Sequence, residues 1–486
     1  MYQWTHEKGV QLQVFWTRLV ERSNSQIKLW TSSIRKWSGL KTDFIISNFI
    51  FLVSIQLFSR NLDIPKATYF DESVYVSAAF RFLKHEVNEN WSHPPLGKMI
   101  LAFGIYIFGN NPVGWRAMSV LFGSAIVVLI YLWAKVLFKD TTRAIECAVL
   151  TLLNQILFIQ SRVGVIDIFM TGFLISGLTL LTLAKRRFDS DQNIYNRFFY
   201  GSLIAFSLSA ACKWYAWIPA FFCVIYYLFK TNFPKRKKFG INFLLVLACL
   251  ILPYAISFIP TIGMRHPTYA PALSSPVPLN ISAPRNDPIY RRHYGISDFF
   301  TLHYQMLLAQ LEFSNSPAVF NTSVFSWPLM LYPMWIAAEK RPYPNGDQYT
   351  RAIVWIGNPL IMWVGFLAIG CCLLLFWKKR DPVAGLIAGI YILLWLSWLL
   401  IPRKVTLSYY YLPAALILSL AIPYTFKVLK FSFLTRINFI LAATLVMLYF
   451  YPWLVGDPLT PQQFQERLWF SSWKNAPPQI AALLPF

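Results

Sequence analysis

Long apolar runs separated by short polar turns make up most of this chain of 486 residues. A helix that crosses a bilayer needs about 20 predominantly apolar residues, and eleven runs approach or reach that length. We predict membrane spans over residues 43–59, 113–138, 144–160, 164–184, 198–212, 213–229, 240–258, 352–377, 382–401, 406–426 and 435–452. The pattern therefore predicts an all-α polytopic membrane protein with about 11 transmembrane helices.

Two of the intervals between these runs are long, and they divide the chain. The expected parts are an N-terminal segment (1–42), a first transmembrane region (43–258) containing a first loop (60–112), a second loop (259–351), a second transmembrane region (352–452) and a tail (453–486). Inside the first loop, residues 96–108 are apolar but too short to span, so we expect them to lie along the membrane interface.

Composition strengthens the membrane interpretation. The chain is 56% hydrophobic and 13% charged, against about 45–50% and about 25% in average soluble domains. This excludes a soluble enzyme, a disordered protein and a secreted disulfide scaffold. The six cysteines form no CxxC pair, so no disulfide framework is predicted. The sequence also lacks a phosphate-binding P-loop, a dinucleotide fingerprint and the usual zinc-ligand spacings.

The formal net charge of +23 would suggest nucleic acid in a soluble protein. Here the positive-inside rule applies first. With a cytoplasmic N-terminus, the turns after even-numbered spans carry eighteen Lys and Arg residues, and the short turns on the other side carry four. We therefore predict a multi-pass protein of the cell membrane with a cytoplasmic N-terminus and both long loops outside, and no nucleic-acid partner.

Two adjacent carboxylates, Asp71 and Glu72, follow the first span and lie among aromatic residues. A carboxylate at the membrane surface can act as a general base or as a metal ligand. The alternative is structural, since acidic residues also stabilise the N-terminus of a helix.

Six cations lie at the extracytoplasmic edge of the predicted spans: Lys98, Arg116, Arg162, Lys213, Arg403 and Lys404. Charge at such positions is costly unless it meets an anion or a cavity. A lipid-linked phosphate or diphosphate would use such a set of cations. The alternatives are headgroup binding by Lys98, simple anchoring by Arg116, and an ion pair between Arg162 and Asp167.

In this order, the motifs resemble the protein O-mannosyltransferase family of the glycosyltransferase C superfamily over nearly the whole chain. The matching segments are Phe70–Glu72, His93–Lys98, Gly114–Arg116, Ser161–Asp167, Lys213–Trp214, Leu302–Met306, Ser326–Met330, Ile356–Pro359 and Pro402–Pro413. The chain differs from the family pattern at Gln310, where a second His is frequent, and over Asn315–Ala318.

The resemblance implies a glycosyltransferase C-type fold. It also implies transfer of mannose from polyprenyl-phosphate-mannose to Ser or Thr hydroxyls of exported proteins, with inversion, on the extracytoplasmic face. Asp71 would be the catalytic base, and Glu72 would assist it or orient a ligand. Arg116, Lys213 and Arg403 would hold the lipid phosphate, because a leaving phosphate needs fixed cations, and Lys98 and Arg162 belong to the same predicted set. The further candidate substrate contacts are His93, His303, Trp327 and Asn358.

Two other functions stay open at this point: a related transferase that moves a sugar onto a lipid, such as an aminoarabinose transferase, and a non-enzymatic polyprenyl-phosphate transporter. The segments Ser326–Met330 and Ile356–Pro359 argue against the first. Two long aromatic-rich loops on one face argue against alternating access, and therefore against a transporter.

The expected partners are the lipid-linked donor, exported polypeptides and the secretion machinery. The sequence identifies no particular cofactor, and a divalent cation at Asp71 and Glu72 is left open.

Overall fold

The computed structural model describes residues 41–231, 239–266, 292–312, 321–342, 348–401 and 405–485. The chain divides into two compact units, Met1–Leu52 and Val53–Phe486. The helices of the second unit are α2 (Glu72–Leu83), α3 (Leu96–Phe108), α4 (Pro112–Phe138), α5 (Thr141–Leu152), α6 (Gln155–Gln160), α7 (Asp167–Asp191), α8 (Arg197–Cys212), α9 (Trp217–Lys230), α10 (Phe239–Ile256), α11 (Phe299–Glu312), α12 (Pro359–Lys379), α13 (Pro382–Leu396), α14 (Leu412–Val428), α15 (Phe433–Val455), α16 (Pro461–Glu466) and α17 (Pro478–Ala481). Short 3-10 turns include η1 (Trp214–Ala216), η8 (Ser397–Leu400) and η9 (Ser408–Tyr411), and the strands are β1 (Arg265–His266), β2 (Arg292–His293), β3 (Met334–Pro342) and β4 (Gln348–Trp355).

Local chemistry fixes where several long helices begin. In α4, α12 and α13 an Asn or Asp side chain accepts hydrogen bonds from backbone N–H groups of the first turn, and Pro occupies the first helical position. Pro does not destabilise a helix at this position, because a backbone N–H there would have no acceptor within the helix. The three pairs are Asn111-Pro112, Asn358-Pro359 and Asp381-Pro382.

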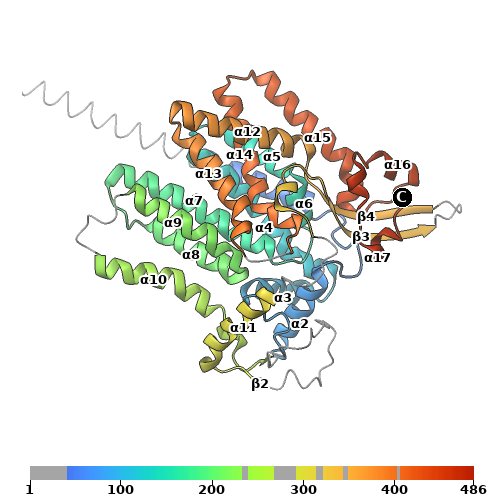
Figure 1. The fold of residues 1–486 in the computed structure, drawn as a ribbon, viewed down its shortest axis with the longest axis horizontal. Helices are drawn as coiled ribbons and strands as arrows, with labels where there is room; N and C mark the ends of the chain where they lie inside the picture. The colour runs from blue at the N-terminus through green and yellow to red at the C-terminus, as the bar shows by residue number, and fades with distance from the viewer. Residues whose placement is uncertain are drawn as a thin grey trace, which may run out of the picture. The chain divides into compact units, whose positions relative to one another are not determined.

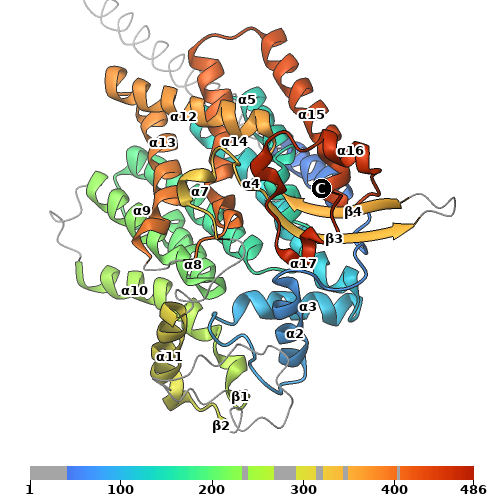
Figure 2. The same cartoon turned by 45° about the vertical axis from the view of Figure 1, so that its right-hand side comes forward.

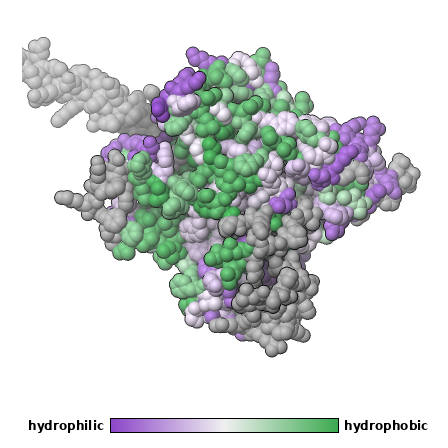
Figure 3. Space-filling view, in the orientation of Figure 1, coloured by the Kyte–Doolittle hydropathy of each residue, from purple (hydrophilic) through white to green (hydrophobic). Residues whose placement is uncertain are grey.

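Helices α7 and α14 form the core of the bundle. The most apolar window of α14 with η9 is 83% buried and that of α7 is 72% buried, whereas the windows of α10 and α15 are 17% buried. α14 packs against α12, α13 and α5, and α7 packs against α4 and α8 (Figure 1). Hydrophobic residues also cover much of the visible face over α12 to α14 (Figure 3). Such a surface matches a lipid environment, so the fold is that of a polytopic membrane protein, as predicted.

The predicted number of eleven spans is not confirmed. Among the described residues, eight helices are long and apolar enough to cross a membrane by length and composition. The run 144–160 is not one helix but parts of α5 and α6, because Asn154 caps α6 by accepting from the N–H of Ile156 and donates to the carbonyl of Ala415. The predicted span 198–212 corresponds to α8, which has 16 residues. The predicted span 213–229 corresponds to η1 followed by α9, which has 14 residues.

The second loop contains β-structure that the all-α prediction did not include. β1 pairs with β2, and β3 pairs with β4 in an antiparallel hairpin. The start of the predicted span 352–377 therefore lies in β4, and the helix begins at Pro359. The tail covers the hairpin: Trp335 Nε1 donates to the carbonyl of Trp473 at 2.9 Å, and α16 and α17 lie beside the strands (Figure 2).

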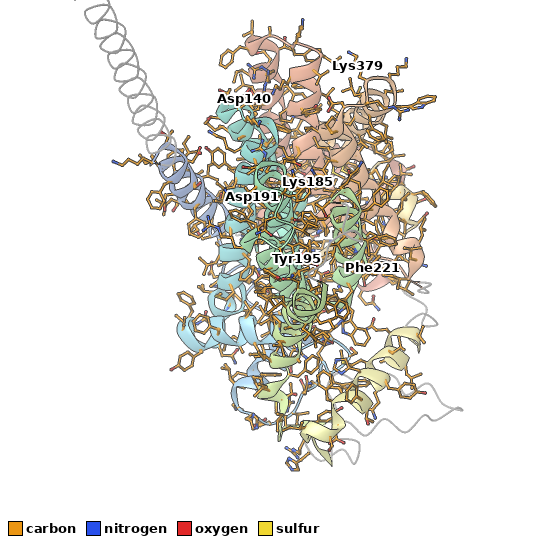
Figure 4. The ribbon with its side chains drawn as sticks, turned by 90° about the vertical axis from the view of Figure 1, so that its left-hand side faces the viewer. Asp140, Lys185, Asp191, Tyr195, Phe221 and Lys379 are labelled. Carbon is orange, nitrogen blue, oxygen red and sulfur yellow. The ribbon has the colours of Figure 1, made fainter. Side chains whose placement is uncertain are left out.

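Charged side chains pair with one another at one end of the bundle. At that end, Glu146 of α5 forms ion pairs with Arg143 and with Arg436 of α15. The turn residues Asp140 and Lys379 lie at the end of the unit away from α11 (Figure 4). These are turns that the sequence assigns to the cytoplasmic side, and the structure separates them from the second loop.

Helix α11 of the second loop presents an apolar outer face. Its inner face contacts Tyr254 of α10 and the turn after that helix, where Phe299 packs edge-on against Phe258. On the outer face Phe300 is 82% exposed and Tyr304 is 62% exposed, and Leu307 continues the stripe. Because α10 also exposes large apolar side chains beside it, we expect this face of α11 to lie in the outer lipid leaflet.

Spin labels test this placement. A nitroxide on Phe300→Cys should be accessible to oxygen and protected from a water-soluble nickel reagent in proteoliposomes. A label on Lys340→Cys, in the exposed part of β3, should show the opposite preference. Cys249 and Cys371, the free cysteines that are not fully buried, are replaced by Ser in both. Equal accessibility of the two labels to nickel would place α11 in water.

Candidate active site

Glu72 lies in the first turn of α2 and is fully buried against Arg116 of α4. Arg116 Nε donates to Glu72 Oε1 at 2.9 Å and Nη2 donates to Oε2 at 2.8 Å. Oε1 also accepts from the backbone N–H of Gly164 at 2.8 Å. Both carboxylate oxygens are therefore held inside the protein, in the bidentate geometry that suits Arg.

The remaining N–H groups of Arg116 bind backbone carbonyls of the first loop. Nη1 donates to Leu62 and Pro65 at 2.8 and 2.9 Å, and Nη2 donates to Ala67 at 3.2 Å. All five N–H groups of the guanidinium thus have protein acceptors. We predicted that Arg116 holds the lipid phosphate, but in this structure none of its N–H groups is left for that role.

Lys98 binds the same loop, and Arg162 binds the start of this loop and Phe58 just before it. Lys98 is fully buried, and its Nζ donates to Asn88 Oδ1 at 2.7 Å and to the carbonyls of Asn90 and His93 at 2.5 and 3.2 Å. Arg162 donates to the carbonyls of Phe58 and Asn61. Burial lowers the pKa of Lys98 to about 7. These two cations, with Arg116, satisfy carbonyls of a loop folded among apolar helices, where an unpaired carbonyl would be costly.

Removing one member of the buried ion pair should destabilise the protein strongly. We expect Arg116→Met to lower the free energy of unfolding by about 3–5 kcal/mol, because it leaves a buried, uncompensated carboxylate at Glu72. The measurement is denaturant unfolding in bicelles. The matched control is Lys66→Met, which breaks an exposed ion pair with Asp63 and should change stability little. Similar losses in both variants would contradict the structural role of Arg116.

Asp71 differs from Glu72 in its exposure and in its hydrogen-bond partner. It is the residue before α2, its side chain makes no capping hydrogen bond, and it is partly exposed. Its Oδ2 accepts a hydrogen bond at 2.9 Å from the hydroxyl of Tyr409 in η9. Phe70, with φ of 54°, packs edge-on against the same tyrosine ring. Of the two adjacent carboxylates, Asp71 is therefore the one placed to meet a substrate.

Lys213 joins α8 to η1 and lies beside Tyr409, the residue that binds this carboxylate. Its Nζ is 2.7 Å from Asp167 Oδ1, and both side chains are at most 5% exposed. The ammonium also lies over the rings of Tyr410 and Tyr409, at 4.6 and 5.4 Å from their centroids. The predicted alternative, a pair between Arg162 and Asp167, is wrong, because Asp167 pairs with Lys213.

Asp167 retains a buried oxygen, Oδ2, without a hydrogen-bond partner. An unpaired buried polar atom is costly unless water or a ligand meets it. The pair of Lys213 and Asp167 is thus incompletely satisfied within the protein, unlike the pair of Arg116 and Glu72.

An aromatic stack forms the wall beside Lys213. Tyr410 stacks on Trp398 with centroids 4.2 Å apart, and Trp398 stacks on Tyr215 at the same distance. The Tyr215 hydroxyl donates to the carbonyl of Leu394 at 2.6 Å, which ties η1 to α13. The stack supports the Tyr410 ring that the Lys213 ammonium lies over.

His303 lies in a separate network. Trp214 Nε1 donates to the hydroxyl of Tyr254 at 2.7 Å, and that oxygen is 2.8 Å from His303 Nε2. His303 Nδ1 is 2.7 Å from the carbonyl of Phe299, so Nδ1 carries the proton and Nε2 accepts from the tyrosine. Burial lowers the pKa of His303, which fits a neutral ring that links α11 to α10.

The other predicted contacts have mainly structural partners. Asn358 is fully buried and donates to the carbonyls of Ala443 and Leu153 while it caps α12. Trp327 is buried and donates to Thr322 Oγ1. His93 lies near the ring of Tyr75. Asn358 and Trp327 thus belong to the packed interior and not to an open site.

Gln310, where the sequence differs from the family pattern, connects α11 to the first loop. Its Nε2 donates to the carbonyl of Ser92 at 3.0 Å. Arg403 and the segment Asn315–Ala318 lie outside the described residues. The predicted role of Arg403 in phosphate binding stays a prediction.

The carboxylates at 71 and 72 do not fit a divalent-cation site as a pair. Both oxygens of Glu72 are held by a guanidinium, so the two carboxylates do not share one free space. Among the described residues, no three His, Cys, Asp or Glu side chains gather in a way that could hold a metal ion.

Comparison with known proteins supports this picture. A family model described as dolichyl-phosphate-mannose-protein mannosyltransferase matches residues 92–257, and one described as the C-terminal four-transmembrane region of protein O-mannosyltransferase matches residues 295–473. A polyprenol-phosphate-mannose–protein mannosyltransferase of Mycobacterium tuberculosis is 22% identical in an alignment 456 residues long, and the match covers 83% of this chain and 86% of the relative.

Two solved structures resemble the fold. The Saccharomyces cerevisiae protein O-mannosyltransferase complex Pmt1–Pmt2, bound to the sugar donor, matches with a TM-score of 0.67 and 14% identity over 89% of this chain and 92% of that one. ArnT from Cupriavidus metallidurans, bound to undecaprenyl phosphate, matches with a TM-score of 0.52 and 13% identity over 83% and 63%.

The likeness to these two solved structures confirms the predicted glycosyltransferase C-type fold, a polytopic bundle of apolar helices. The family models narrow the class further. This chain belongs to the protein O-mannosyltransferase family.

Proposed function

We propose that this enzyme transfers mannose from polyprenyl-phosphate-mannose to Ser or Thr hydroxyls of exported proteins. Support comes from the family models, from the named relative and from the site. The observation that carries the proposal is the position of Asp71, which is partly exposed and accepts a hydrogen bond from Tyr409, the same tyrosine that the buried Lys213 ammonium lies over. A carboxylate base and a fixed cation that contact the same tyrosine suit attack by a hydroxyl and departure of a phosphate.

The proposed step is a single displacement. The acceptor oxygen bonds to C1 of mannose as its proton passes to Asp71, and the bond from C1 to the phosphate oxygen breaks. Polyprenyl phosphate leaves with both electrons of that bond, and the configuration at C1 inverts. Lys213 meets the negative charge that develops on the leaving phosphate, with Arg403 as a second predicted cation.

We propose that the active site faces the extracytoplasmic side of the cell membrane. The balance of Lys and Arg among the turns supports this orientation. An acceptor chain emerging from the secretion machinery would then meet Asp71 in an extended, unfolded form.

The test is the identity of the labelled product. Purified protein in nanodiscs receives polyprenyl-phosphate-[³H]mannose and a peptide rich in Ser and Thr. We expect the peptide to become labelled. β-Elimination should then release the label, because it releases sugars that are linked through a Ser or Thr oxygen. Label in a lipid and none in the peptide would instead indicate a transferase that acts on lipids, and no transfer at all would favour a transporter.

A further inference from the structure

Three consecutive tyrosines precede α14, and each hydroxyl or ring has a different partner. The Tyr409 hydroxyl donates to Asp71, the Tyr410 ring lies under the Lys213 ammonium, and the Tyr411 hydroxyl is 2.6 Å from that of Tyr391. All three side chains are at most 3% exposed. The turn η9 therefore brings the base and the cation to one rigid element.

The contact between Tyr409 and Asp71 is directional. The Tyr409 hydroxyl is 2.9 Å from Oδ2, which is a full hydrogen bond to a charged acceptor. Phe70 packs at right angles on the Tyr409 ring, with centroids 5.4 Å apart. Phe70 also has a left-handed backbone conformation, which an L-residue adopts only where its surroundings enforce it. Both sides of the contact are thus held in place.

We propose that Tyr409 is a positioning residue for the transfer reaction: its hydroxyl holds the Asp71 carboxylate in the orientation and the ionised form that accept the acceptor proton. This inference rests on the proposed function. The hydrogen bond favours the ionised carboxylate, because it stabilises the charged form more than the neutral one. It also fixes one carboxylate oxygen, so the group does not rotate away from the acceptor.

Several titratable groups surround the Tyr409 hydroxyl. They are Asp71 and Tyr75 from the first loop and α2, Asp167 of α7, Lys213 before η1, and Tyr410 beside it. The hydrogen bond to Asp71 is the direct contact among them, so replacing the Tyr409 hydroxyl changes the environment of that carboxylate most.

The test compares Tyr409→Phe with Tyr411→Phe. Each variant removes one buried hydroxyl of the same turn, and Tyr411 serves as the matched control because its hydroxyl binds Tyr391. We expect Tyr409→Phe to lower kcat about tenfold, in the range for a lost hydrogen bond to a charged group, with the donor KM unchanged. The acidic limb of the pH profile of kcat/KM for the peptide should move to higher pH. Tyr411→Phe should leave the limb where it is.

A second replacement of Tyr409 keeps the hydroxyl and should shift the acidic limb of the pH profile in the opposite direction. With 3-fluorotyrosine at position 409, the phenol is a stronger hydrogen-bond donor, and the acidic limb should move to lower pH. An unmoved limb in both replacements, or an equal shift in Tyr411→Phe, would overturn the proposal while leaving the mannosyltransferase function intact.

Infrared titration provides a readout that does not need turnover. The carboxyl band that disappears in Asp71→Asn reports protonation of Asp71. Its midpoint should be higher in Tyr409→Phe than in the wild type and lower with 3-fluorotyrosine. Midpoints that coincide in all three proteins would refute the role of Tyr409 even if no mannose transfer were detected.

Discussion

Asp71→Asn is expected to reduce mannose transfer to peptide by a factor of about 10²–10⁴, which is the usual contribution of a general base. Asparagine has nearly the same shape and can still accept the hydrogen bond from Tyr409, but it cannot take up the acceptor proton. Asp71 makes no capping hydrogen bond and is partly exposed, so the variant should unfold at the same temperature as the wild type. Initial rates with labelled donor and peptide, together with thermal unfolding in detergent, measure both quantities.

The neighbouring carboxylate supplies the control. Glu72→Gln removes a charge that the Arg116 guanidinium needs, so this variant should lose stability as well as activity. A loss of activity without a loss of stability in Glu72→Gln, combined with near-normal transfer by Asp71→Asn, would make Glu72 the base instead.

The sequence could not separate these two carboxylates. They are adjacent, and both lie after a span and among aromatic residues. Residues one position apart on a helix point about 100° from each other, so one can face the interior while the other faces a site. The partner that decides between them, Arg116, is 44 residues away along the chain, and no local pattern reveals it.

The sequence was also unable to show which of the predicted cations bind a ligand and which bind the protein backbone. Lys98, Arg116, Arg162 and Lys213 all look like phosphate ligands, because a charge beside an apolar span signals a buried anion or cavity. Three of them, Lys98, Arg116 and Arg162, bind mainly backbone carbonyls of the first loop or of Phe58 just before it. Backbone carbonyls exist at every residue, so the sequence carries no sign of them, and charge alone cannot distinguish a loop anchor from a ligand-binding site.

The fold was more predictable than the site, since apolar length follows directly from the bilayer thickness. Prediction failed where a polar residue interrupts an apolar run and caps a new helix, as Asn154 does between α5 and α6. It also missed Tyr409, whose partner Asp71 is 338 residues away. A tyrosine in an aromatic run before a span looks like an ordinary interface residue.

Lys213→Met is the second change with a large expected effect. The ammonium lies beside Tyr409 and Tyr410, and its carboxylate partner Asp167 has an unpaired oxygen. If Lys213 meets the leaving phosphate, its loss should lower kcat by about 10²–10³, as for removal of a preorganised donor at a developing charge. The donor KM should also rise, because phosphate binding contributes before the chemical step.

The variant also leaves Asp167 buried without its counter-charge, which alone can destabilise the protein. The double variant Lys213→Met/Asp167→Asn removes both charges and should recover much of the lost stability. If its transfer rate stays low, the missing cation and not misfolding causes the defect, and Lys213 binds the phosphate. Recovery of normal kcat and donor KM in the double variant would show that Lys213 serves only to neutralise Asp167. The comparison needs unfolding curves and initial rates for the wild type, both single variants and the double variant under one set of conditions.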